Sequence, residues 1–175
     1  MSKATGPLYV VHFKRRREGK TDYAKRLALL KSGKPRLVVR KTNRFVIVQV
    51  VSCGEKGDET VACATSKALG HFGFQGKSNS PSAYLTGLLC GIKAKAKGVS
   101  EIVLDVGLQT PSKGSVVFAA LKGAVDAGLS AGFSEEKMPS AERIEGKQLE
   151  KGGGDFTGAK QKILAHGATH SKKKQ

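Results

Sequence analysis

Basic side chains crowd into one stretch of the chain, residues 14–44, which holds 13 lysines and arginines but only two acids, Glu18 and Asp22. The stretch carries +11 of the formal net charge of +17. Like charges at this density repel one another and favour an expanded chain, and a polyanion would relieve that repulsion. An ordinary solvated surface intersperses charges of both signs. The stretch therefore predicts binding to nucleic acid, with an affinity that falls as salt rises, because each phosphate contact releases a counterion.

The absence of several well-known motifs indicates which kind of nucleic acid the protein binds. It contains no zinc finger, no leucine-zipper heptads and no aromatic RNP motif, which disfavours a reader of double-stranded DNA. Tyr23 lies among the cations, where its ring could stack on a base, although it could equally belong to the apolar face of a helix. We expect folded RNA, recognised through its shape and its phosphates.

A second segment, HFGFQGKS at residues 71–78, comes close to the phosphate-binding pattern GxxxxGK[ST]. Its first glycine is replaced by His71, and the segment does not lead directly from a strand into a helix. A nucleotide site is therefore disfavoured. Two interpretations stay open: a flexible loop whose backbone and Lys77 touch RNA, and a plain connector.

The acidic and histidine residues do not predict an enzyme. The expected order of elements resembles the ribonuclease H class in outline, which draws attention to Asp105 within an apolar segment. Nuclease chemistry of that kind needs several carboxylates converging on two metal ions, and no recognisable motif joins Asp105 to Glu101 or Asp126. His166 and His170 lie in a lysine-rich tail without a carboxylate or cysteine nearby. We expect no catalytic site, no metal and no cofactor.

Length and composition indicate one domain with extensions, because 175 residues with 39% hydrophobic residues suffice for a modest core. No apolar run approaches the length of a membrane span, and no signal sequence follows Met1, so a soluble intracellular protein is expected. The cysteines Cys53, Cys63 and Cys90 match neither a disulfide framework nor a zinc pattern. They are expected to be free and mostly buried.

The elements that must position the basic residues begin with a helix capped by Thr21 and ended by Ser32-Gly33. Two strands follow at 36–40 and 44–51, joined by a turn, and a third strand at 59–65 completes an antiparallel meander. Alternation along the first strand makes one face of this hairpin cationic and leaves the other to pack.

The second half of the chain alternates helices and strands. A helix over 81–97, capped by Ser80, leads to a strand over 101–107 that is expected to join the sheet in parallel, and a helix follows over 115–128. Short helices are predicted over 140–148 and 157–165, with a linker at 151–155 and a disordered end at 171–175. The predicted fold is α/β, with a single mixed sheet made of the meander and a fourth, parallel strand. Three regions are expected: a basic N-terminal arm and helix (1–34), a core domain (35–133) and a helical, basic C-terminal tail (134–175).

This order of segments resembles a known family. RRREGKTDYAKR, KPRLVVRKTNRFVIVQVV and GSVVFAALKGAVDAGL together look like the archaeal branch of the large-subunit ribosomal protein that binds 5S ribosomal RNA, numbered eighteen in bacteria and archaea and five in eukaryotes. The resemblance covers residues 9–150. It implies an arm that clasps 5S ribosomal RNA, and assembly with the second 5S-binding protein, numbered five in bacteria and archaea. It also implies attachment to large-subunit ribosomal RNA at the central protuberance of cytoplasmic ribosomes.

The resemblance also implies which residues touch RNA. The arm matches the RNA-binding motif, the hairpin matches the strand face and turn that lie on RNA, and two loops are weaker matches. The implied residues are Arg15, Arg16, Arg17, Lys20, Thr21, Tyr23 and Arg26 in the arm, Arg36, Arg40, Lys41, Asn43 and Arg44 in the hairpin, and Gln75, Gly76, Lys77, Ser112 and Lys113 in the loops. From Lys151 onward the family varies, and no contact is implied.

Three alternatives remain at this stage. The sister small-subunit protein numbered eleven shares the fold but lacks an arm like RRREGKTDY ahead of its first strand. An enzyme of ribonuclease H type would need a cluster of acids. A protein that binds acidic protein surfaces would keep its partners after RNase treatment.

Overall fold

A five-stranded mixed sheet forms the centre of the computed structural model, which describes residues 6–149 and 155–172. The strands are β1 (Arg36–Lys41), β2 (Val46–Gly54), β3 (Gly57–Thr65), β4 (Glu101–Asp105) and β5 (Ser130–Ala131), in the order β3-β2-β1-β4-β5. The predicted antiparallel meander and the predicted parallel addition of β4 are confirmed, and the strand next to β4 is β1. The short β5, parallel to β4, was not predicted, because two residues carry no periodicity.

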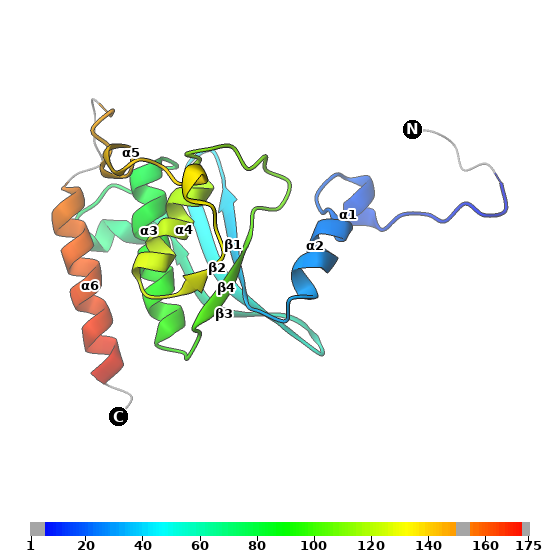
Figure 1. Cartoon of the computed structure of the whole chain (residues 1–175), viewed down its shortest axis with the longest axis horizontal. Coiled ribbons are helices and arrows are strands. Elements are labelled where there is room, and N and C mark those ends of the chain that lie inside the picture. The colour runs from blue at the N-terminus through cyan, green and yellow to red at the C-terminus, as the bar shows by residue number, and fades with distance from the viewer. Residues whose placement is uncertain (1–5, 150–154, 173–175) are drawn as a thin grey trace.

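The two faces of the sheet have different cover. Helices α3 (Ser80–Lys95) and α4 (Val116–Asp126) pack on one face, and α5 (Ala141–Glu145) and α6 (Phe156–Lys172) pack on α3. The short helices α1 (Lys14–Arg17) and α2 (Tyr23–Leu30) lie on the opposite side of the sheet, at the far end of the molecule from α6 (Figure 1). The described residues also include the 3-10 helices η1 (Ser66–Phe72) and η2 (Glu135–Lys137). The second face of the sheet is therefore left to the basic arm.

The core lies between the sheet and α3. Leu37 and Val39 point from β1 toward the helices and are fully buried, as the alternation of that strand predicts. Helix α3 is buried on all sides over residues 81–91, because the sheet, α4 and α6 surround it. Its sequence predicts only a single apolar stripe; the wider burial is possible because the residues between the leucines are small.

Two glycines let α3 and α4 approach closely. A Cβ at Gly87 would lie 2.0 Å from the carbonyl oxygen of Ala120, and one at Gly123 would lie 2.1 Å from that of Tyr84. Backbone atoms cannot give way as a flexible side chain can. The backbone of each helix therefore occupies the space that a side chain at the glycine of the other helix would need.

Several helix boundaries differ from the sequence prediction. Asp22, not Thr21, caps α2, since its carboxylate accepts hydrogen bonds from the N–H groups of Ala24 and Lys25. Asn79, not Ser80, caps α3 through the N–H of Ser82. Both corrections move a cap by one residue between neighbours that can each serve as a cap.

The C-terminal helix is longer than predicted. Helix α6 continues to Lys172 and so includes the first two residues of the segment that was expected to be disordered, because its buried residues Ala159 and Ile163 anchor it on the core. Residues 173–175 and most of the predicted linker, 151–154, lie outside the described residues. None of the helices in the described part of the chain is both long and apolar enough to cross a membrane.

The cysteines are free, but the expectation that they are mostly buried is wrong. Cys90 is buried in α3, whereas Cys53 and Cys63 are exposed on β2 and β3. Cys63 is paired with Gln49, so its thiol lies on the face of the sheet opposite to α3 and α4, and Cys53 lies next to the turn between β2 and β3. Burial raises the pKa of the Cys90 thiol to about 12, so that this thiol stays protonated at neutral pH.

The packing of α3 on α4 gives a first prediction. Gly87→Ala should lower the free energy of unfolding by about 1–3 kcal/mol, because the added methyl group must push two backbones apart. Gly132→Ala is the control, since a Cβ there meets nothing within 4 Å. Urea denaturation measures both variants, and an equal effect of the two substitutions would contradict the close approach.

The thiols give a second prediction. Iodoacetamide at about pH 8 should alkylate Cys53 and Cys63 in the folded protein and spare Cys90, because only a thiolate with access to the reagent reacts. Mass spectrometry should count two adducts in native buffer and three in denaturant. A third adduct in native buffer would show that α3 opens readily.

Candidate nucleic-acid interface

A groove of about 710 Å³ lies between the basic arm and the helix-free face of the sheet. Its walls come from the arm, from β1, β2 and β3, and from the end of β4 with the loop that follows. We call it the arm groove. Six basic side chains line it against three acidic ones: Arg15, Lys20, Lys25, Arg26, Arg36 and Arg40 against Asp22, Asp58 and Asp105.

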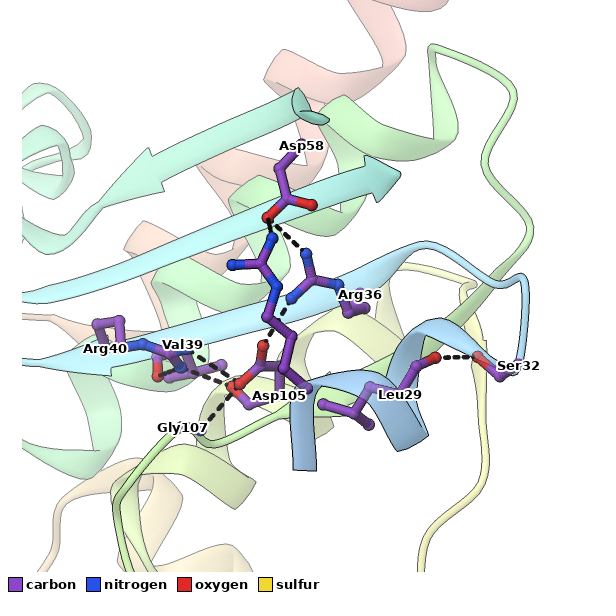
Figure 2. Close-up of polar contacts among 9 residues, drawn as sticks. Leu29, Ser32, Arg36, Val39, Arg40, Asp58, Asp105 and Gly107 are labelled. Atoms are coloured by element: carbon purple, nitrogen blue, oxygen red, sulfur yellow. Dashed lines mark hydrogen bonds and ion pairs between the residues drawn. The ribbon is translucent and has the colours of Figure 1, made fainter. Parts of the chain in front are cut away.

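A chain of ion pairs crosses the groove and joins the arm to the sheet (Figure 2). Asp58 Oδ2 lies 2.7 Å from Arg26 Nη2 of α2 and 2.7 Å from Arg36 Nη2 of β1. Asp105 on β4 binds Arg36 Nη1 at 2.9 Å and Arg40 Nη2 at 3.0 Å. Two carboxylates thereby hold α2, β1, β3 and β4 together.

Arg36 is less accessible than a residue that touches RNA would be. It is on the predicted face of β1, but only 4% of it is exposed, and Asp105 beside it is 6% exposed. The parallel register of β1 and β4 pairs Val38 with Asp105, which brings the carboxylate to the same face as the arginines. At the centre of that face, Asp58 and Asp105 therefore neutralise the positive charge of Arg36. We leave Arg36 out of the candidate interface.

The hydrogen bonds of Asp105 explain why an acidic residue occurs within the apolar strand β4. Its carboxylate accepts hydrogen bonds from Arg36, from Arg40 and from the backbone N–H of Gly107. Within the described residues no three His, Cys, Asp or Glu side chains gather in a way that could hold a metal ion. Asp105 is thus a partner of arginines and does not belong to an acidic cluster.

The arm displays its cations to solvent. Arg15, Arg16, Arg17 and Lys20 are exposed, and Arg15 Nε donates to Thr21 Oγ1 at 2.9 Å, which folds α1 back toward α2. Helix α2 buries none of its residues, and its apolar stripe is open, with Leu27 55% exposed.

Tyr23 is partly covered by the ring of Phe13, whose centroid lies 5.2 Å from its own. The arm therefore presents both charge and apolar surface away from the core.

A second group of the predicted residues gathers at the turn between β1 and β2. Lys41, Asn43 and Arg44 are exposed there, and the loop with Gln75 and Lys77 lies beside them, because Ser78 Oγ donates to the carbonyl oxygen of Asn43 at 3.0 Å. Gly76 is needed for packing, since a Cβ would lie 1.7 Å from the carbonyl oxygen of Ser66. The near match to a phosphate-binding loop thus has a structural cause.

The remaining predicted residues, Ser112 and Lys113, stand apart. Both are exposed in the loop between β4 and α4, and Lys113 Nζ pairs with Glu136 at 3.4 Å. The groove also contains residues that sequence reasoning left out. Two of them are Lys25 of α2 and Gln49 of β2, and Gln49 was a visible signal, because it is the one polar residue in the apolar run of β2 from Val46 to Val51.

Comparisons with a family model and with individual known proteins agree with one another. The chain matches the family described as ribosomal large subunit proteins 60S L5 and 50S L18 over residues 8–100 and 92–134. It is 52% identical over 147 residues to the large ribosomal subunit protein uL18 of Methanoculleus marisnigri, covering 83% of this chain and 84% of that protein. It is 53% identical over 142 residues to the protein of the same name from Korarchaeum cryptofilum, covering 81% and 73%.

The buried ion pairs give a third prediction. Asp105→Asn should lower the free energy of unfolding by about 3 kcal/mol, because it leaves the buried guanidinium of Arg36 with less compensating charge. Glu136→Gln, which breaks the exposed pair with Lys113, should change stability by no more than about 0.5 kcal/mol. Thermal and urea unfolding measure both, and similar small losses in the two variants would contradict the structural role of Asp105.

Proposed function

Because this chain belongs to the family of ribosomal large subunit proteins 60S L5 and 50S L18, we propose that it binds 5S ribosomal RNA through its N-terminal arm. Membership of the family makes the chain a structural constituent of the large ribosomal subunit and not an enzyme. The relatives are large-subunit proteins, so the small-subunit alternative is not retained.

The observation that carries the proposal is the unbalanced charge of the arm. Arg16 and Arg17 are exposed and form no described ion pair, and the one described side-chain hydrogen bond of Arg15 goes to the hydroxyl of Thr21. Two carboxylates of the groove, Asp58 and Asp105, are already shared among Arg26, Arg36 and Arg40, and the third, Asp22, caps α2 and pairs with Lys25. The arm thus offers guanidinium groups whose best available partners are phosphates.

The ion pair between Arg26 and Asp58 supports a mechanism of partial preorganisation. A wholly disordered arm would lose its conformational entropy on binding RNA, which weakens the complex. The Arg26–Asp58 pair and the hydrogen bond of Arg15 to Thr21 restrict the arm beforehand. The arm then closes on RNA while the hairpin turn, with Lys41 and Arg44, sets the register. Specificity comes from RNA shape, because the deep groove of an RNA helix hides its base edges.

The family resemblance supports the wider assembly. We infer that the complex of this protein with 5S ribosomal RNA binds large-subunit ribosomal RNA and the neighbouring 5S-binding protein, numbered five in bacteria and archaea. The place of this assembly would be the central protuberance of cytoplasmic ribosomes. No small-molecule substrate or cofactor enters this scheme.

A salt series gives the fourth prediction. The variant in which Arg15, Arg16 and Arg17 are all changed to Ala should bind 5S ribosomal RNA at least about tenfold more weakly than wild type. Its plot of log affinity against log salt should be shallower by about 0.7–0.9 for each phosphate that the variant no longer binds. Filter binding or fluorescence anisotropy measures both quantities, beside an unrelated folded RNA of equal length.

The matched control removes the same charge elsewhere. Lys137, Arg143 and Lys147 are exposed on the segment after β5 and line neither the arm groove nor the hairpin turn. Changing these three to Ala should leave the preference for 5S ribosomal RNA intact. Equal affinity of wild type for both RNAs at every salt concentration would reduce the protein to a generic polycation and refute the proposal.

A further inference from the structure

The free edge of the sheet at β3 has two halves of different character. Within the described sheet β3 pairs only with β2, and the opposite edge is the two-residue strand β5. The first half of β3 and the turn before it carry the acids Glu55, Asp58 and Glu59. Residues 60–65, TVACAT, carry no charge and contain neither proline nor glycine. The second half of β3 therefore lacks the residues with which an edge strand usually prevents pairing.

An uncharged edge strand is a template for a further strand. Its outward N–H and C=O groups are unpaired, and exposed segments of about six or seven residues without charge or proline pair readily with identical segments. Thr60, Val61 and Thr65 are also β-branched, which favours the extended conformation. The partner that fits this half of β3 is the same strand in a second copy of the chain, because two identical uncharged strands place no like charges opposite each other.

Two lysines from another element reach this half of the edge. Lys93 Nζ, in the last turn of α3, donates to the carbonyl oxygen of Cys63 at 3.4 Å, and Lys97 Nζ, just after α3, donates to that of Val61. Among the described residues neither lysine forms an ion pair with a carboxylate. Two backbone acceptors of β3 are thus occupied by side chains of the same molecule.

The spacing of these contacts matches the two elements. Lys93 and Lys97 are four residues apart, which is about 6 Å along a helix, and Val61 and Cys63 are two residues apart, which is about 6.8 Å along a strand. The backbone N–H of Ala96 still makes a helical hydrogen bond, so the helical path continues past the end of α3 toward Lys97. Since α3 packs on β3, one helical turn supplies a donor to two positions of the strand.

A β-bulge lies at the same place. The register of β2 and β3 shifts between Val50 and Val51, which leaves Val61 as an extra residue without a partner on β2. Bulges bend a strand and interrupt its ladder, and they are a second means by which natural sheets discourage pairing at an edge. The bulge and one of the two lysine contacts therefore coincide at Val61.

We propose that Lys93 and Lys97 hold closed a strand-pairing surface on β3 that fits the β3 strand of a second copy of this chain. We call these two residues the edge lysines. Pairing would have to displace both side chains from the carbonyl oxygens of Val61 and Cys63. A two-fold symmetric pair would also bring the ammonium groups of both copies to one seam, where they repel one another. With the edge lysines in place the protein stays monomeric, and RNA has no part in this inference.

The test uses the full chain without RNA. The double variant Lys93→Ala with Lys97→Ala should dimerise with a dissociation constant at least about tenfold lower than the value, or the lower limit, found for wild type. Sedimentation velocity over a series of protein concentrations measures this constant. Hydrogen exchange should report where the copies meet, because the backbone amides of residues 60–65 should exchange more slowly in the dimer.

The matched control removes equal charge from positions that do not reach β3. Lys95 lies between the edge lysines in the sequence, but its Nζ is beside Gly128, and Lys137 is exposed in η2. The variant Lys95→Ala with Lys137→Ala should keep its dissociation constant within about twofold of the wild-type value.

Three results would overturn the inference. The double variant could remain monomeric at every concentration, or the control could dimerise as tightly, in which case loss of charge alone explains association. The dimer could also protect amides outside β3, such as those of the exposed apolar segment 8–13. The single variant Lys93→Ala, which leaves Lys97 in place, should shift the constant in the same direction by a smaller factor. If the double variant does not fold, an unchanged constant in this single variant decides against the edge lysines.

Discussion

The buried pair of Arg36 and Asp105 is the interaction on which the arrangement of the charged surface depends. An arginine with 4% exposure is stable inside a protein only when its charge is compensated, and the two carboxylates that compensate it come from β3 and β4, on either side of β1 in the sheet. The same carboxylates reach outward to Arg26 and Arg40. The strand register brings Asp58 and Asp105 to Arg36, and Asp58 in turn holds Arg26 of the arm. The position of the arm therefore depends on the register of the sheet.

The one-sided packing of the sheet makes room for this arrangement. Close approach of α3 and α4 at Gly87 and Gly123 lets two helices and their neighbours cover one face completely, so that the core needs no cover on the second face. That second face is then free to carry arginines and the polar Gln49. Function and stability are therefore divided between the two faces of a single sheet.

The distribution of charged residues over the surface depends on the fold as well as on the sequence. The arm is basic in any conformation, because its cations are neighbours along the chain. Lys67 and Lys162, by contrast, are 95 positions apart, and only the packing of η1 on α6 brings them to the same side of the molecule. Acids are confined mainly to the β2–β3 turn, to β4 and to the segment from β5 to α5, where they pair with arginines and lysines or face solvent. The result is a protein with cations at both ends of its long axis.

The sequence by itself determined what depends on near neighbours. The meander, the parallel strand after α3, the helices α2 to α6 and the basic arm could all be predicted, because periodicity and turn residues act over a few positions. The tertiary structure decided the rest. Arg36 could be assigned to a strand face, but its burial depends on Asp58 and Asp105, which only the register of the strands brings to it. Likewise α6 extends beyond its predicted end because Ile163 docks on a core formed by distant residues, and burial against distant residues leaves no local signal in the chain.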